Sequence, residues 1–174
     1  MKKIVLALLS TTAASVAFSA PNTITFQGEV SEQTCSVNVN GNEDSPIVLL
    51  PTVPSSALGA SGNTAGTTTF NIALTGCTAP GTTTTMGVAF IGNNVTANGN
   101  LGNTGTAQNV ELQLLDAAGG NTVDLTSPAT VTGTHTLNAG ETAADHDFAV
   151  QYYANGSATA GTVISSVQYA ISYE

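Results

Sequence analysis

The sequence has almost no basic side chains. Its 174 residues contain only two Lys and Arg in total, Lys2 and Lys3, against 11 Asp and Glu, and the formal net charge is −9. A chain with this balance cannot neutralise nucleic-acid phosphates, so DNA and RNA are excluded as partners. It also has no Arg for bidentate recognition of carboxylates, and no Lys after residue 3 for Schiff-base chemistry.

Aromatic residues and long amphipathic helices are scarce as well. Aromatic residues make up 5% of the chain and Trp is absent, whereas Thr and Val favour strands and Gly and Asn favour turns. Alternating apolar residues predict strands near 34–39, 69–74, 86–91, 110–115, 122–125, 129–137, 148–152 and 163–173. The segment 93–109 is interpreted as a surface loop or a short hairpin. The fold class is therefore all-β, with the strand spacing of a sandwich.

The longest apolar run lies at the N-terminus. Lys2 and Lys3 precede an apolar stretch that begins at Ile4, and small residues follow, which is the order of a secretory signal. The stretch is too short and too interrupted by Ser and Thr to span a bilayer. We expect residues 1–20 to be a signal peptide, 21–32 an N-terminal extension and 33–174 one domain. Removing 1–20 removes both lysines and leaves a formal side-chain charge of −11, which favours solubility and self-repulsion.

Cysteine is limited to Cys35 and Cys77. An even count in an exported chain indicates one disulfide. The bridge would close a loop of about 43 residues and stabilise the fold by about 4 kcal/mol on the chain-entropy model. Two free thiols are the alternative, and a metal site is disfavoured because neither Cys has a His or a second Cys at ligand spacing.

The sequence also lacks the motifs of common enzyme classes. It contains no G-x-S-x-G, Walker or G-x-G-x-x-G motif. Of the two histidines, His135 is expected on an exposed strand position. In the triplet Asp145-His146-Asp147, strand alternation sends His146 to the face opposite the two carboxylates, so one ion cannot bind all three. We therefore expect no catalytic residue, no metal and no cofactor.

Both ends of the mature chain have the pattern of strands with one apolar face. Near the N-terminus the apolar positions are Ile24, Phe26 and Val30, and Gly28 leaves a gap in the row. At the C-terminus the shared face consists of Val167, Tyr169, Ile171 and Tyr173. A Gly in a strand weakens it and often marks the close approach of another backbone. The terminal strands are therefore candidates for pairing outside their own domain.

These features follow one another in an order that resembles a known family. The order is a signal peptide, Ile24-Thr-Phe26-Gln-Gly28-Glu-Val30, Cys35, Leu49-Leu50-Pro51, Ala65-Gly66, the segment from Phe70 to Cys77, and an alternating C-terminus with Tyr173 as the penultimate residue. It resembles the type 1-like fimbrial pilins, which are structural subunits of chaperone–usher pili in Gram-negative bacteria. The resemblance covers essentially the whole mature chain.

The resemblance implies an immunoglobulin-like sandwich that lacks its final strand and is completed by a donor strand from a neighbouring subunit. It assigns residues 21–32 to the donor-strand extension and 33–174 to the pilin domain. Four donor-strand residues would fill the groove, namely Ile24, Phe26, Gly28 and Val30. Four residues would form the groove edge that a chaperone and an incoming strand contact, namely Val167, Tyr169, Ile171 and Tyr173. Cys35 and Cys77 match the disulfide of the family.

The function that the resemblance implies is a structural subunit of a fimbria on the cell surface, which polymerises by donor-strand exchange and supports adhesion and biofilm formation. Its partners would be identical or related pilins in a homopolymer filament, a periplasmic pilus chaperone and an outer-membrane usher. Two alternatives stay open. One is a minor or adaptor pilin, and the other is a secreted monomeric β-sandwich that binds sugar or calcium.

Overall fold

The computed structural model describes residues 35–43, 46–127 and 130–173. The predicted signal peptide and the donor-strand extension, with Ile24, Phe26, Gly28 and Val30, lie outside the described residues. Their boundaries therefore stay predictions. Within the described part, no helix is long and apolar enough to cross a membrane.

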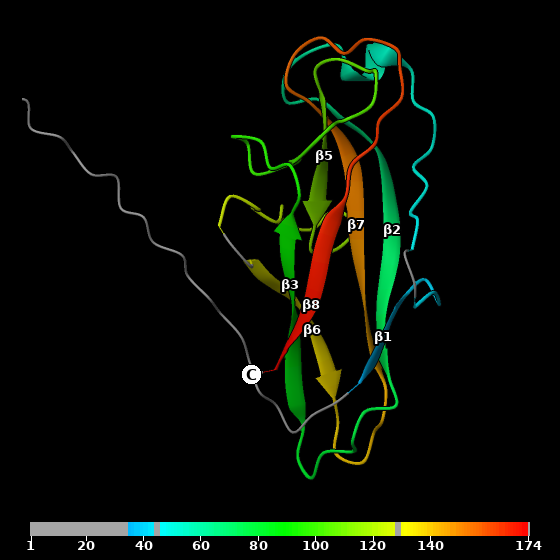
Figure 1. The fold of residues 1–174 in the computed structure, drawn as a ribbon, viewed down its shortest axis with the longest axis vertical. Coiled ribbons are helices and arrows are strands. Elements are labelled where there is room, and N and C mark those ends of the chain that lie inside the picture. Colours follow the sequence, from blue (N-terminus) through cyan, green and yellow to red (C-terminus); the bar gives the residue numbers. More distant parts are fainter. Residues whose placement is uncertain (1–34, 44–45, 128–129, 174) are drawn as a thin grey trace, which may run out of the picture.

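The described chain consists of strands and one short 3-10 helix, η1 (Ser55–Leu58). The strands are β1 (Ser36–Val39), β2 (Thr64–Thr75), β3 (Thr84–Gly92), β4 (Leu101–Gly102), β5 (Val110–Leu115), β6 (Thr130–Leu137), β7 (Ala144–Ala154) and β8 (Val167–Tyr173). They form two antiparallel sheets that pack face to face, with the orders β1-β2-β7-β5-β4 and β6-β3-β8 (Figure 1). The prediction of an all-β sandwich is confirmed.

The core lies between the sheets because apolar residues alternate along the strands. Phe70 on β2, Phe90 on β3 and Phe148 on β7 are all buried. The rings of Phe70 and Phe148 stack at 5.8 Å between centroids, and Phe90 meets Phe148 edge-on at 5.2 Å. Gly133 on β6 makes room for this cluster, since its φ is +69° and a Cβ there would lie 2.5 Å from the Phe148 ring.

Two expectations about strands were wrong. In the segment 122–125, Thr122 forms only an isolated bridge to Leu115, and Val123 and Leu125 are buried in the core from a loop. Their apolar character therefore reflects packing and not a strand. The last strand begins at Val167 and not at residue 163, because backbone groups of Thr162 and Ile164 accept hydrogen bonds from the 104–107 segment instead.

Candidate binding groove

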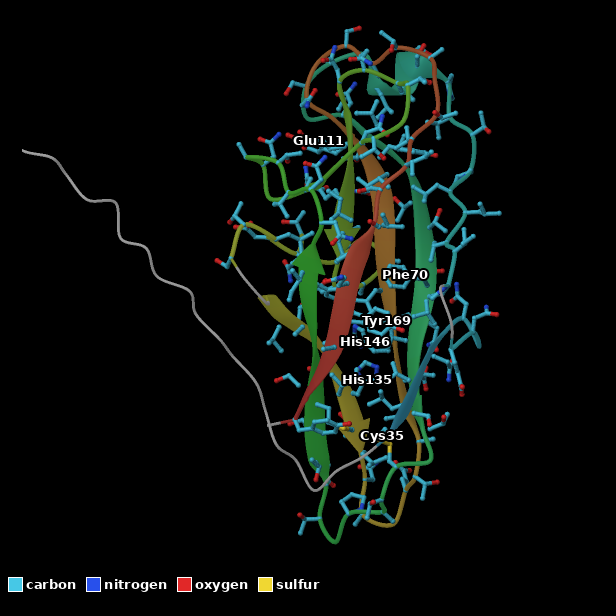
Figure 2. All side chains as sticks on the ribbon, in the orientation of Figure 1. Cys35, Phe70, Glu111, His135, His146 and Tyr169 are labelled. Atoms are coloured by element: carbon cyan, nitrogen blue, oxygen red, sulfur yellow. A yellow bond between two sulfur atoms is a disulfide. The ribbon has the colours of Figure 1, made fainter. Side chains whose placement is uncertain are left out.

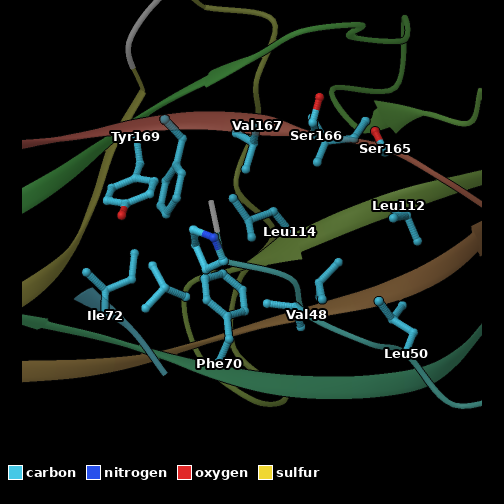
Figure 3. Close-up of a pocket in the computed structure, with 15 residues that line it drawn as sticks. Val48, Leu50, Phe70, Ile72, Leu112, Leu114, Ser165, Ser166, Val167 and Tyr169 are labelled. Carbon is cyan, nitrogen blue, oxygen red and sulfur yellow. The ribbon is translucent and has the colours of Figure 1, made fainter. Parts of the chain in front are cut away.

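An apolar groove opens between the edges of the two sheets. β1 pairs only with β2, and β8 pairs only with β3, so each is an edge strand in the described chain. The space between these edges has a volume of about 210 Å³. Most of its lining is apolar (Figure 3): Val39, Pro46, Val48, Leu50, Phe70, Ile72, Phe90, Leu101, Leu112, Leu114, Val150, Ser165, Ser166, Val167 and Tyr169.

The groove floor is the exposed side of the hydrophobic core. Phe70, Ile72 and Leu114 are at most 8% exposed and belong to one core cluster. Val167 and Tyr169 pack against that cluster. One wall is the extended segment 46–50. The other wall is residues 165–169, which include the first residues of β8. This geometry is that of a sandwich with a gap where one more strand would lie between two edges.

A second cavity, of about 460 Å³, lies at the end of the same two walls. Its lining includes Val53, which follows the first wall, and Val163, which precedes the second, together with Leu58, Val110 and Tyr152. The two cavities therefore follow one course between the 46–53 and 158–169 segments, and a single extended chain could contact both.

The four predicted groove-edge residues lie on one face of β8, but at two different places. Val167 and Tyr169 line the groove directly. Ile171 packs against both the groove core and the cluster around the disulfide, and Tyr173 packs against the disulfide cluster alone. The structure thus brings two of the four into the groove and places Tyr173 at its disulfide end.

Sequence reasoning missed the opposite wall. The segment 47–50 enters the family resemblance only through Leu49 and Leu50, and no site role is expected for it from the sequence. Val48 and Leu50 face the groove, whereas Ile47 and Leu49 are 80% and 83% exposed. All four positions of the run are apolar, so the sequence carries no alternation that would separate Val48 and Leu50 from the exposed Ile47 and Leu49.

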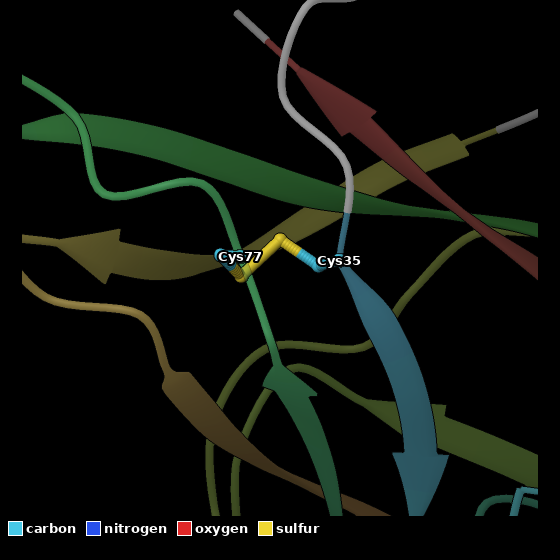
Figure 4. The surroundings of a disulfide bond; sticks show 2 residues. All are labelled: Cys35 and Cys77. Carbon is cyan, nitrogen blue, oxygen red and sulfur yellow. A yellow bond between two sulfur atoms is a disulfide. The ribbon is translucent and has the colours of Figure 1, made fainter.

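The predicted disulfide is confirmed. Cys35 and Cys77 are bridged, with their Cα atoms 4.2 Å apart (Figure 4). Cys77 is buried with Leu74, Met86 and Leu137. The bridge joins the residue before β1 to the segment just after β2, so it fixes the short strand that borders the groove.

The two histidines lie between the two sheets of the sandwich (Figure 2). His135, expected at an exposed position, is fully buried, and its Nε2 lies 2.8 Å from the backbone oxygen of Ile72. Because a carbonyl oxygen only accepts, Nε2 carries the proton and donates, and the buried Nδ1 has no hydrogen-bond partner. Burial lowers the pKa of His135, because a charged imidazolium would lose its hydration there. This residue therefore ties the three-stranded sheet to β2 as a neutral side chain.

His146 faces the core, with its ring 4.6 Å from that of Phe148 and its Nε2 2.7 Å from the backbone oxygen of Asp116. Asp145 and Asp147 lie on the outer face, where both accept hydrogen bonds from the side-chain amide of Asn71. The two carboxylates and the imidazole are thus separated by the sheet, as strand alternation predicts. In the described residues no three His, Cys, Asp or Glu side chains gather in a way that could hold a metal ion.

Glu111 is the one buried carboxylate of the described chain. It accepts hydrogen bonds from Thr96, Asn98, Asn100 and Asn155 at 2.9–3.2 Å. Burial alone would raise the pKa of Glu111, but these donors stabilise the ionised form and the pKa lies below its ordinary value. The carboxylate therefore organises the 96–100 loop beside β5 and the end of β7.

Comparisons with known proteins agree with this geometry. The family model described as fimbrial protein matches residues 24–174. The chain belongs to the fimbrial protein family. It is 37% identical to the F17 fimbrial protein of Escherichia coli, over the full length of both chains. It is 36% identical to the major fimbrial subunit SMF-1 of Stenotrophomonas maltophilia, over 89% of this chain and 94% of that one.

The fold of this fimbrial protein is also similar to that of a solved pilus subunit. The crystal structure of the P pilus rod subunit PapA matches 80% of this chain and 99% of its own, with a TM-score of 0.61 at 15% identity. That likeness concerns the fold alone. The two-sheet fold is thus an arrangement that this fimbrial protein shares with a rod subunit.

Proposed function

We propose that this chain is a structural subunit of a surface fimbria and that its groove is filled by the N-terminal strand of the next subunit. The observation that carries the proposal is the apolar groove between β1 and β8, whose floor is the hydrophobic core itself. A small ligand would leave the backbone edge of β8 unpaired on its groove side, whereas an added strand satisfies that edge and covers the floor together.

The donor segment is Ile24 to Val30 of another copy. Its apolar face offers Ile24, Phe26 and Val30, and burying such side chains contributes about 1.5–3 kcal/mol each. The backbone bonds to β8 add about 0.5–1.5 kcal/mol each. The opposite face of the segment is Thr, Gln and Glu, which suits a strand that is buried on one side only.

The contact that results cannot close on itself. Each subunit offers a donor segment at its N-terminus and a groove between β1 and β8, so donor and acceptor are different surfaces. Heterologous contacts of this kind build open filaments. The partners are therefore further copies of this subunit or related subunits, and the site of action is the fimbria at the cell surface.

An open groove with an apolar floor also requires protection before assembly, because exposed sheet edges template aggregation. A periplasmic chaperone meets this requirement by lending its own strand to β8. At an outer-membrane usher, the donor segment of the next subunit then replaces the chaperone strand. Residues 1–20 act as the signal that exports the chain, and Val167, Tyr169, Ile171 and Tyr173 form the edge that chaperone and donor strand contact in turn.

A secreted monomeric module that binds sugar or calcium is less consistent with the geometry. The groove lining is apolar apart from Ser165 and Ser166, whereas calcium needs several oxygen ligands and a sugar needs several hydrogen-bonding side chains. A minor or adaptor subunit would use the same groove and donor segment and differ in copy number. Nothing in the described residues favours catalysis, and the family is one of fimbrial proteins.

The experiment is to place a bulky side chain at Gly28. Gly28→Leu adds a side chain to the face that enters the groove, so fibres seen by electron microscopy should be lost while the subunit still accumulates in the periplasm. Gln27→Leu is the matched control, because the same side chain then lies on the outer face of the donor strand and fibres should form. Fibres of normal length from Gly28→Leu would refute the proposed orientation of the donor segment.

A further inference from the structure

Asn is followed directly by Gly at three places in the sequence, residues 40–41, 98–99 and 155–156. In such a pair the backbone nitrogen of Gly can attack Cγ of the Asn side chain, because Gly has no Cβ to obstruct a close approach. The N–Cγ bond forms, the Cγ–Nδ2 bond breaks, and ammonia leaves with the proton of the Gly nitrogen. Water then opens the five-membered succinimide ring to aspartate or isoaspartate. Each pair is therefore chemically prone to deamidation.

Two of the three pairs converge on one carboxylate. Asn98 donates from Nδ2 to both oxygens of Glu111 at 3.2 Å, and Asn155 donates from Nδ2 to Oε1 of Glu111 at 2.9 Å. Both asparagines are exposed to water, whereas Glu111 is only 4% exposed. Glu111 lies toward the end of the sandwich away from Cys35 (Figure 2). Two asparagines from different loops, each prone to the same reaction, thus share a single buried partner.

The third pair is held in a different way. Oδ1 of Asn40 accepts a hydrogen bond from the backbone N–H of Asn71 at 2.8 Å. Asn40 and Gly41 form the turn after β1, with φ values of +49° and +78°. A type I′ turn needs positive φ at both positions and therefore favours Asn-Gly. The side-chain amide of Asn40 is thus held through its oxygen, whereas those of Asn98 and Asn155 are held through their nitrogens.

The attacking nitrogens of two pairs are held alike. The N–H of Gly41 donates to Oδ1 of Asn38 at 3.0 Å, and the N–H of Gly99 donates to the backbone oxygen of Thr96 at 3.0 Å. The pairs 40–41 and 98–99 therefore differ in the side-chain amide that is attacked and not in the nitrogen that attacks it.

Hydrogen bonds to the amide change how readily Cγ is attacked. A donor on Oδ1, as at Asn40, withdraws electrons from the carbonyl and makes Cγ more electrophilic. A carboxylate on Nδ2, as at Asn98 and Asn155, has the opposite effect, and it also holds the side chain away from the following nitrogen. Hydrogen bonds to an ionised group are roughly twice as strong as neutral ones, so breaking them adds to the barrier.

We propose that Glu111 protects Asn98 and Asn155 from deamidation. Forming the succinimide at either residue takes a donor away from the buried carboxylate, and the product places a second carboxylate against it. The chain has no Lys or Arg after residue 3 to neutralise such a pair. The reaction is thus opposed at its intermediate and at its product. This role does not depend on how the groove is filled.

The experiment follows deamidation by peptide mass spectrometry in the exported chain, incubated at alkaline pH, where the Gly nitrogen loses its proton more readily. Glu111→Gln removes the charge at nearly constant shape. Deamidation of Asn98 and Asn155 should then accelerate together by about tenfold, which corresponds to about 1.4 kcal/mol, close to the low end for one hydrogen bond to a charged group. Asn40 should convert at the wild-type rate, because its side chain bonds Asn71 instead.

Gly133→Ala is the matched control for loss of stability. A Cβ at Gly133 would meet Phe148 and His146, so this variant is strained while the contacts of Glu111 are intact. It should leave all three deamidation rates unchanged. Unfolding the wild-type chain in urea with the disulfide reduced should largely remove the difference between the three pairs, because every protecting contact is then lost.

Two results would overturn the inference. One is wild-type rates at Asn98 and Asn155 in Glu111→Gln. The other is an equal acceleration in Gly133→Ala, which would make general loss of stability the cause. If Glu111→Gln does not accumulate, the folded wild-type chain decides the question: faster conversion of Asn40 than of Asn98 and Asn155 would support the inference, and equal rates or the reverse order would contradict it.

Discussion

Removing the disulfide should cost this subunit a large part of its stability. The bridge joins residues 42 positions apart, Cys35 and Cys77. Chain entropy for a loop of that length corresponds to about 4 kcal/mol at about 25 °C, against a total of roughly 5–15 kcal/mol for a typical domain. The cost falls on the groove in particular, because β1 has only four residues, Ser36–Val39, and pairs only with β2.

The assay is urea unfolding of the mature subunit followed by circular dichroism. Replacing both cysteines by Ala should lower the free energy of unfolding by about 4 kcal/mol, and with a slope of about 1–3 kcal/mol/M the midpoint should fall by more than about 1 M. Replacing both by Ser should cost more, because Cys77 is buried among Leu74, Met86 and Leu137 and a hydroxyl there loses its hydration. Reduced wild-type protein should match the Ala variant. A loss below about 1 kcal/mol in the Ala variant would refute the view that the bridge constrains the unfolded chain.

Three further changes test buried polar and packing contacts elsewhere in the domain. Burial lowers the pKa of His135 below its unfolded value of about 6.5, so the neutral side chain contributes its full stability above about pH 6.5 and this contribution is lost as the pH falls below that value. Between about pH 7.5 and about pH 5, the free energy of unfolding should therefore decline more steeply for wild type than for His135→Leu. Equal slopes would contradict this. Glu111→Gln should lower stability by about 1–3 kcal/mol, because amide donors then face another amide, whereas Glu43→Gln, at an exposed position, should have no effect in the same urea titration. Gly133→Ala should be destabilising by more than about 1 kcal/mol, since φ is +69° and the Phe148 ring occupies the space; thermal melting at wild-type temperature would count against it.

Much of the sandwich could be predicted because its strands alternate. Phe70, Ile72 and Leu74 follow one another on one face of β2, and all are buried. The prediction failed at 122–125, where Val123 and Leu125 are buried from a loop. Two apolar residues with period two are consistent with a strand. Whether residues 122–125 form one depends on their pairing with the neighbouring β5, which is limited to the bridge between Leu115 and Thr122.

The groove could be predicted from its C-terminal edge but not from its other wall. The apolar row of β8 is long and regular, so Val167 and Tyr169 were identified. Val48 and Leu50 lie in a short run that ends at Pro51, and no local pattern reveals that this run borders a gap between two sheets. His135 was misplaced for a related reason, since its threonine neighbours suggest an exposed strand, whereas its burial depends on the distant carbonyl of Ile72.

The most direct test of the account is a cryo-electron microscopy structure of the assembled fibre, which identifies the chain in the groove. The account predicts residues 24–30 of a neighbouring copy beside β8, with Ile24, Phe26 and Val30 facing the groove and the backbone of that segment traced to a different subunit. A groove that is empty, or that is occupied by the N-terminal segment of the same chain, would contradict it.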